Sequence, residues 1–275
     1  MNKKTNQTDK FNTLGEKPVG KLLMQYAIPA IVAMTASSIY NIIDGIFIGQ
    51  GVGKEAIMGL ALTGPVMSLT AAFGAMVGVG ASTLMSVRLG QKDYATAQKI
   101  LGNVVIMNVA MGLLLGLGLQ LFLSPILRFF GASDATLPYA HDFMTVILAG
   151  NVVTHLYLGL NALLRSTNRP MMAMYATFGT VILNCIFAPI LIFGLDWGIR
   201  GAATATILAQ ICMLTWQLHL FSNKDDLIHL SRDILRIDPR IVRESLVIGL
   251  PPFLINLCAC FVAITVTRSM TQYGG

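Results

Sequence analysis

Hydrophobic residues run along this chain in seven long stretches, and short polar segments separate one stretch from the next. Each stretch is long enough to form a helix that crosses a bilayer, which takes about 20 apolar residues. The predicted spans cover residues 22–48, 61–87, 100–124, 138–163, 171–195, 200–222 and 246–270. The pattern therefore predicts an all-α integral membrane protein with seven transmembrane helices.

The composition agrees with a membrane protein and excludes a disordered chain, a fibrous repeat and an ordinary soluble enzyme. Of the 275 residues, 55% are hydrophobic and only 12% are charged, whereas about a quarter of a soluble domain is charged. The four cysteines all lie in apolar stretches, and Cys258-x-Cys260 lacks the partner ligands that a zinc site needs. We therefore interpret the cysteines as small residues packed in the membrane.

The basic residues alternate along the chain in a way that predicts the direction of the helices. The N-terminal segment and every second connection carry five, three, two and five Lys or Arg, whereas the other three connections carry one each. This distribution follows the positive-inside rule and predicts a cytoplasmic N-terminus. The net charge of +6 is thus explained by topology, and binding to nucleic acid is not expected.

One acidic residue, Asp44, lies inside a predicted span, and the other twelve acids lie in the tail, in loops or near span ends. An ionisable group within a membrane span is costly and is a functional candidate by default. Asn41 precedes Asp44 by three residues and shares its helix face. Pro29 removes a backbone hydrogen bond and gives the same helix a place to bend. Two interpretations stay open: a carboxylate solvated near the outer interface, or one that faces an internal cavity and binds a proton or a small cation.

The fourth span carries polar residues at helical spacing, on roughly one face. They are Asn151, Thr154, His155, Asn161 and Arg165. Such a stripe would face other helices or water, so hydrogen bonding between helices and a polar cavity are both compatible with it. Asn184 in the fifth span and Thr206 in the sixth supply oxygen atoms that suit a weakly held hard cation when they are grouped around a carboxylate.

Several motifs occur in a fixed order on spans one, two, four, five and six. They are Pro29 with Tyr40-Asn41-Ile-Ile-Asp44 and Gly49, Arg88-Leu-Gly90, Leu164-Arg165-Ser-Thr-Asn-Arg-Pro170, Ile182-Leu-Asn184 with Pro189, and Gly198-Ile-Arg-Gly201-Ala-Ala-x-Ala-Thr206. Together they resemble the multidrug and toxic compound extrusion (MATE) transporters, especially the bacterial drug-efflux branch. The resemblance covers nearly the whole chain.

The resemblance implies two six-helix bundles related as parallel repeats. On that pattern, residues 1–21 form a cytoplasmic tail, 22–222 the N-terminal bundle, 223–245 a cytoplasmic linker and 246–275 the first helix of an incomplete second bundle. The final Tyr273-Gly-Gly275 looks like the family's loop after span seven, so we expect a fragment of a longer protein. Because the linker mixes Leu and Ile with charged residues, we expect it to lie along the cytoplasmic membrane surface.

The resemblance also implies roles for individual residues. Asp44, Asn184 and Thr206 would form the site that binds the coupling ion, Na⁺ or H⁺. Further residues are expected to line the substrate cavity or to act as helix hinges. The cavity residues are Tyr40, Asn41, Asn151, His155 and Asn161, and the hinges are Pro29 and Pro189. Many relatives carry an acid where this chain has Ala188, and this departure makes H⁺ a rival to Na⁺.

The expected function is secondary active multidrug efflux by antiport, in which organic cations or amphipathic compounds leave in exchange for H⁺ or Na⁺. We expect no enzymatic activity, no cofactor and no metal other than Na⁺ at the coupling site. The expected location is the bacterial cytoplasmic membrane, with the full-length protein as a monomer. A flippase for lipid-linked oligosaccharides is the alternative, although it would need cationic residues in its cavity for an anionic diphosphate. An intramembrane enzyme would need a paired nucleophile and base or a metal-binding array.

Overall fold

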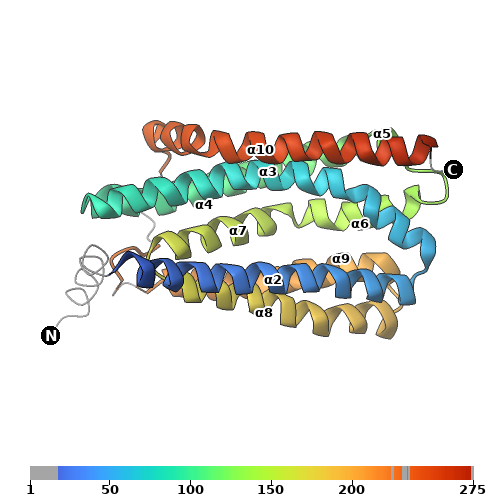
Figure 1. The fold of residues 1–275 in the computed structure, drawn as a ribbon, viewed down its shortest axis with the longest axis horizontal. Coiled ribbons are helices and arrows are strands. Elements are labelled where there is room, and N and C mark those ends of the chain that lie inside the picture. The colour runs from blue at the N-terminus through green and yellow to red at the C-terminus, as the bar shows by residue number, and fades with distance from the viewer. Residues whose placement is uncertain (1–17, 224–225, 231–233, 235, 274–275) are drawn as a thin grey trace.

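A computed structural model of the chain describes residues 18–223, 226–230, 234 and 236–273. Within these residues the chain forms helices and no β-strand, and the long helices run side by side (Figure 1). The elements are α2 (Val19–Gly51), α3 (Lys54–Gly90), α4 (Tyr94–Leu121), α5 (Leu123–Phe129), α6 (Leu137–Ala149), α7 (Asn151–Ser166), α8 (Pro170–Pro189), the π-helical η1 (Ile190–Gly194), α9 (Gly198–Phe221) and α10 (Pro239–Tyr273). The all-α fold class is confirmed.

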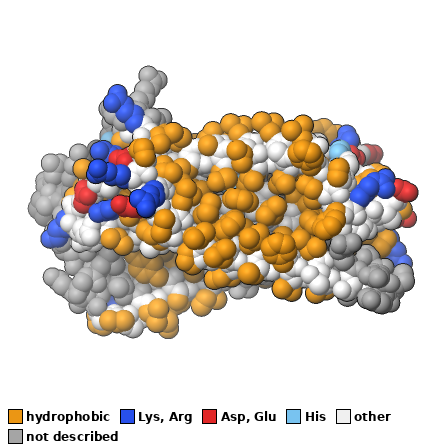
Figure 2. All heavy atoms as spheres, turned by 90° about the horizontal axis from the view of Figure 1, so that it is seen from above, with side chains coloured by type: hydrophobic (Ala, Val, Ile, Leu, Met, Phe, Trp, Pro, Cys, Tyr) orange, Lys and Arg blue, Asp and Glu red, His pale blue; other side chains and the backbone are white. Residues whose placement is uncertain are grey.

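In the described part of the chain, six helices are long and apolar enough to cross a membrane, or seven if the bent pair α6–α7 forms one span. Hydrophobic side chains cover the middle of the face in Figure 2, whereas charged side chains gather at its two ends. Soluble proteins rarely expose such a wide apolar surface. The belt is what a lipid-facing surface requires, which confirms the prediction of a membrane protein.

The fourth predicted span is not one straight helix. Its two halves, α6 and α7, meet at Gly150 and are bent by 58° relative to each other. At this residue the chain passes so close to α9 that a Cβ atom would overlap the side chain of Ile207. Glycine at the bend thus permits a close approach to α9, which the continuous apolar run over residues 138–163 does not reveal.

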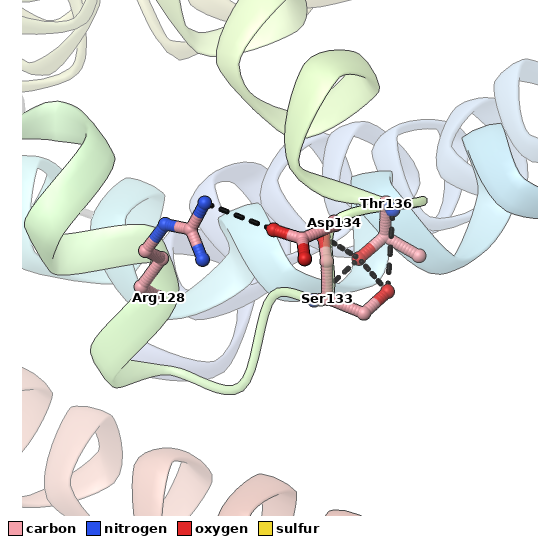
Figure 3. Close-up of polar contacts among 4 residues, drawn as sticks. All are labelled: Arg128, Ser133, Asp134 and Thr136. Carbon is pink, nitrogen blue, oxygen red and sulfur yellow. Dashed lines mark hydrogen bonds and ion pairs between the residues drawn. The ribbon is translucent and has the colours of Figure 1, made fainter.

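A compact turn joins α5 to α6 at the end of the molecule opposite the start of α2 (Figure 1), and Figure 3 shows its polar contacts. The backbone N–H of Ser133 donates to the Thr136 hydroxyl at 3.1 Å, and the Thr136 N–H donates to the Ser133 hydroxyl at 3.3 Å. Arg128 Nη2 lies 2.9 Å from Asp134 Oδ1 across the same turn. These reciprocal bonds pair backbone N–H groups of the turn itself, just before α6 begins.

The segment between α9 and α10 packs into the protein at the end where the chain begins. Ile228 and Ile234 are only 5% and 8% exposed and belong to a core formed with α3, α4, α7 and α8. These two side chains therefore face protein, whereas Ile237 is 64% exposed. The position of the linker along the membrane surface stays a prediction, and Leu235 lies outside the described residues. An apolar pattern indicates that a side chain avoids water, but it does not show whether that side chain contacts lipid or protein instead.

Two carboxamides of α4 hold the backbone of this linker. Gln98 Oε1 accepts from the N–H of His229 at 3.0 Å, while Gln98 Nε2 donates to the carbonyl oxygen of the same residue. Asn103, only 1% exposed, donates to the carbonyl oxygen of Arg236 at 3.2 Å and accepts from the N–H of Asp238 at 2.9 Å. The linker is thus attached to the bundle through its own backbone, where water would otherwise serve as the partner.

Candidate coupling site and cavity

Three polar side chains from three helices meet in the interior. The Tyr40 hydroxyl on α2 lies 2.9 Å from the Thr206 hydroxyl on α9. Asn184 Nδ2 on α8 donates to the same Thr206 oxygen at 2.9 Å and lies 3.4 Å from the Tyr40 oxygen. Such bonds between helices stabilise packing in a membrane, where water offers no competing partner. We call Tyr40, Asn184 and Thr206 the polar triangle.

Asp44 lies one helical turn beyond Tyr40 on α2. The residue is only 7% exposed, so the interpretation of a carboxylate solvated at the interface is not supported. Its Oδ1 atom is buried and has no hydrogen-bond partner among the described residues. A charged carboxylate with one buried, unpaired oxygen is costly, so this position favours a bound proton or cation. Of the three predicted coupling residues, the structure joins Asn184 to Thr206 directly and places Asp44 one turn along α2 from the Tyr40 corner.

A cavity of about 460 Å³ lies among α2, α7, α8 and α9, and the polar triangle forms part of its wall. Three of the predicted cavity residues, Tyr40, Asn41 and Asn161, line it. Apolar and aromatic side chains complete the wall; they include Ala33, Met34, Tyr157, Leu158 and Val181. This mixture of apolar surface and a few polar groups is typical of small-molecule sites.

The polar stripe on α7 does not face a single cavity. Asn151 Nδ2 donates to the carbonyl oxygen of Gly112 on α4 at 3.2 Å, and the imidazole of His155 lies against Gly74 on α3. Thr154 instead donates to Gln210 on α9 at 2.6 Å. Because α7 packs against α3, α4, α8 and α9, side chains on different parts of its surface meet different neighbours. Asn151 and His155 thus lie outside the cavity lining, and hydrogen bonding between helices accounts for Asn151 and Thr154.

Several cavity residues were not among the sequence-based candidates. Thr177 and Thr180 on α8 line the cavity beside Asn184, and Gln210 lines it from α9. The spacing of Thr177, Thr180 and Asn184 at i, i+3 and i+7 places them on one helix face, a signal that was available in the sequence. Arg165, an exposed member of the α7 stripe, also lines the cavity.

The two predicted hinges differ in their local structure. Pro29 is buried within α2, which continues as one helix from Val19 to Gly51. Pro189 ends α8 and leads directly into η1, a π-helical segment. Isolated π-helical turns occur frequently at functional sites. The hinge roles themselves stay predictions.

The buried acids do not form a metal centre of the common kind. No group of three or more His, Cys, Asp and Glu occurs in the described part of the chain. Ala188, which stands where many relatives are expected to have an acid, is fully buried. A cation at this site would therefore have one carboxylate, Asp44, and the neutral oxygens of the polar triangle.

The fold and this open cavity define a polytopic helical membrane protein with a polar site between helices, an arrangement that occurs in transporters. A family model described as MatE matches residues 29–190, more than half of the chain. The chain belongs to the MatE family, as the sequence motifs predicted.

Known relatives and solved structures agree with this assignment. The chain is 28% identical over 259 residues to the "Multidrug export protein MepA" of Staphylococcus aureus, and 27% identical to that of Staphylococcus haemolyticus. It is also similar to a solved structure described as the outward-facing conformation of a multidrug resistance MATE family transporter, with a TM-score of 0.80 and 27% identity over 86% of this chain and 52% of the other. The inward-facing counterpart also gives a TM-score of 0.80, with 25% identity over 89% of this chain and 58% of the other.

The alignments cover most of this chain but only part of each relative. The alignment with the Staphylococcus aureus protein includes 94% of this chain and 57% of that relative. The chain thus spans a little over half the length of the curated relatives it matches.

Proposed function

We propose that this protein takes part in secondary active multidrug efflux, exporting organic cations or amphipathic compounds in exchange for H⁺ or Na⁺. Membership in the MatE family supports this proposal, as do relatives named multidrug export proteins. The proposed location is the bacterial cytoplasmic membrane, with the basic end of the helices in the cytoplasm. We propose that it works as a monomer without an organic cofactor.

The observation that carries the proposal is the buried carboxylate of Asp44, one turn from the polar triangle. A carboxylate without a hydrogen-bond partner at Oδ1 is destabilised while it is charged. Binding of a proton or cation removes this cost. An ion whose affinity for Asp44 differs between outward- and inward-facing forms would shift the balance between them, which is the physical requirement for antiport.

The local arrangement supports H⁺ more directly than Na⁺. The polar triangle is closed by its own hydrogen bonds, with Asn184 Nδ2 directed at both the Thr206 and the Tyr40 oxygens. A hard cation prefers several oxygen ligands, so Na⁺ would have to replace these bonds. A proton needs only Asp44 itself.

The cavity supports the proposed substrate class. Its volume of about 460 Å³ and its wall of apolar and aromatic side chains suit a drug-sized amphipathic molecule. Met34 adds a flexible side chain that adapts to ligands of different shape. Polar groups at Asn41 and Asn161 would orient the ligand within the cavity.

The test is gradient-driven efflux of ethidium, a fluorescent organic cation, from vesicles that contain the protein. We expect an imposed H⁺ or Na⁺ gradient to drive efflux by the unmodified chain, and Asp44→Asn to abolish it. Asp134→Asn is the matched control, because Asp134 lies in the α5–α6 turn with its side chain 88% exposed. Gradient-driven efflux by Asp44→Asn at the level of the unmodified chain would contradict the proposal.

A further inference from the structure

Helices α3 and α10 touch backbone to backbone at one place. A Cβ atom added to Gly80 on α3 would overlap the carbonyl oxygen of Ser245, and one added to Gly249 on α10 would overlap that of Met76. No larger residue fits at either position without movement of a helix. Glycine contacts of this kind let two helices approach more closely than side chains would allow.

Two further attachments lie on the same side of this crossing, toward the end where the chain begins. Arg88 Nη2 on α3 lies 2.9 Å from Glu244 Oε2 on α10, and both side chains are partly exposed. The linker that leads into α10 is held to α4 by Gln98 and Asn103. The start of α10 is therefore attached to α3 by the ion pair and to α4 through the linker.

Toward the opposite end, the contacts between α3 and α10 are of a different kind. The rings of Phe73 and Phe253 lie 5.0 Å apart, and Cys260 Sγ donates to the carbonyl oxygen of Pro65 at 3.3 Å. Beyond Cys260, Ile264 is partly buried against a core of the bundle, whereas Val262 and Val266 are 63% and 51% exposed. This half of the interface is made by side chains, which exchange partners at lower cost than two interlocked backbones.

We propose that the Gly80–Gly249 crossing is a pivot about which α10 swings against α2–α9, and that Arg88–Glu244 is a latch at the end beside the pivot. A rotation about the crossing leaves the contact at that point in place, while points farther along the two helices separate by an amount that grows with distance from the crossing. The end of α10 near Val266 is the end that moves. Small motions at one helix contact are commonly amplified in this manner. The pivot depends on neither the transported compound nor the coupling ion.

Spin-label distances test the pivot in the whole chain, reconstituted in lipid with its four cysteines replaced by serine. One label pair, Ser86→Cys with Arg243→Cys, reports on the latch end; the other, Met58→Cys with Val266→Cys, reports on the far end. All four sites are exposed or partly exposed. We expect a narrow distance distribution at the latch end and a wide one at the far end. Equal widths at both ends would overturn the proposal.

Gly80→Ala adds a direct perturbation. We expect the latch-end distance to increase by about 1–2 Å and its distribution to widen, because interaxial separation follows the size of the side chains at the contact. Gly64→Ala is the matched control on the same helix, since nothing lies within 4 Å of the added Cβ. An unchanged latch-end distribution in Gly80→Ala, or the same change in Gly64→Ala, would overturn the pivot.

Charge reversal keeps the proposal testable should Gly80→Ala fail to fold, because the latch lies at a partly exposed position. We expect Arg88→Glu or Glu244→Arg alone to widen the latch-end distribution. The double variant should restore it, since the pair is then re-formed with opposite polarity. Two outcomes would show that the Arg88–Glu244 pair does not hold this end of α10. One is a single reversal that leaves the latch-end distance distribution unchanged; the other is a double variant whose distribution is as wide as that of the single variants.

Discussion

Thr206→Val tests whether the polar triangle stabilises the contact between α2, α8 and α9. Valine has nearly the same shape as threonine but lacks the hydroxyl, which pairs with Tyr40 and Asn184 at 2.9 Å each. Hydrogen bonds between membrane helices contribute about 0.6 kcal/mol on average and up to about 1.7 kcal/mol. Two such bonds are lost here, and Asn184 is only 2% exposed, so we expect a loss of roughly 1–3 kcal/mol.

The assay is thermal unfolding of the purified protein in detergent, measured against a matched variant. A loss of 1 kcal/mol lowers Tm by about 2–4 °C in proteins of roughly this size, so Thr206→Val should unfold several degrees earlier. Thr204→Val is the control: that hydroxyl lies on the same helix and donates only to the carbonyl oxygen of Arg200 at 2.8 Å. If both variants unfold at the same temperature, the triangle contributes no more than an ordinary hydroxyl on α9, and the argument for it fails.

Three further predictions concern the ends of the helices. Asn103→Ala should increase hydrogen exchange at the Asp238 N–H, which loses its acceptor, whereas an unchanged rate would show that the linker needs no such bond. Hydrogen bonds from Thr96 lower the pKa of Asp93, so its contribution to stability is present above the ordinary pKa of about 3.9 and is lost as pH falls below it. Asp93→Asn should keep the helix cap and remove this part of the acid sensitivity in pH-dependent unfolding. Gly51→Ala should lower Tm because its Cβ would overlap Ile192 in η1, while Gly45→Ala, with nothing within 4 Å, should not.

The predicted spans agree with the structure because burial in a membrane is decided over long windows of sequence. α2, α3, α4, α8 and α9 all include the corresponding predicted stretches or most of their length. The bend at Gly150 and the close approach to Ile207 there were not predicted, because the apolar run is continuous across this residue. The contacts of Ile228 and Ile234 with protein were not predicted for a related reason, because an apolar pattern does not show whether a side chain meets lipid or protein.

The candidate site was predictable in its members and less so in its geometry. Asp44 was identified because an ionisable side chain within a membrane span is energetically costly, and Asn184 and Thr206 were identified by family motifs. The structure joins Asn184 and Thr206 in one hydrogen-bonded group. Tyr40, expected only as a cavity residue, turns out to be the third corner of that group. On α7, by contrast, residues that share a helical face diverge toward different neighbours, as Asn151 and His155 show.

The sequence by itself determined the membrane-spanning class, the approximate spans, the family and the residue types from which a coupling site could be built. These properties follow from hydrophobicity summed over about 20 residues and from motifs that are local in the chain. Only the tertiary structure decided which helix faces which. The polar triangle, the bend at Gly150 and the glycine crossing between α3 and α10 each join residues that are far apart in sequence. Helical periodicity assigns a side chain to a face, but packing decides what that face meets.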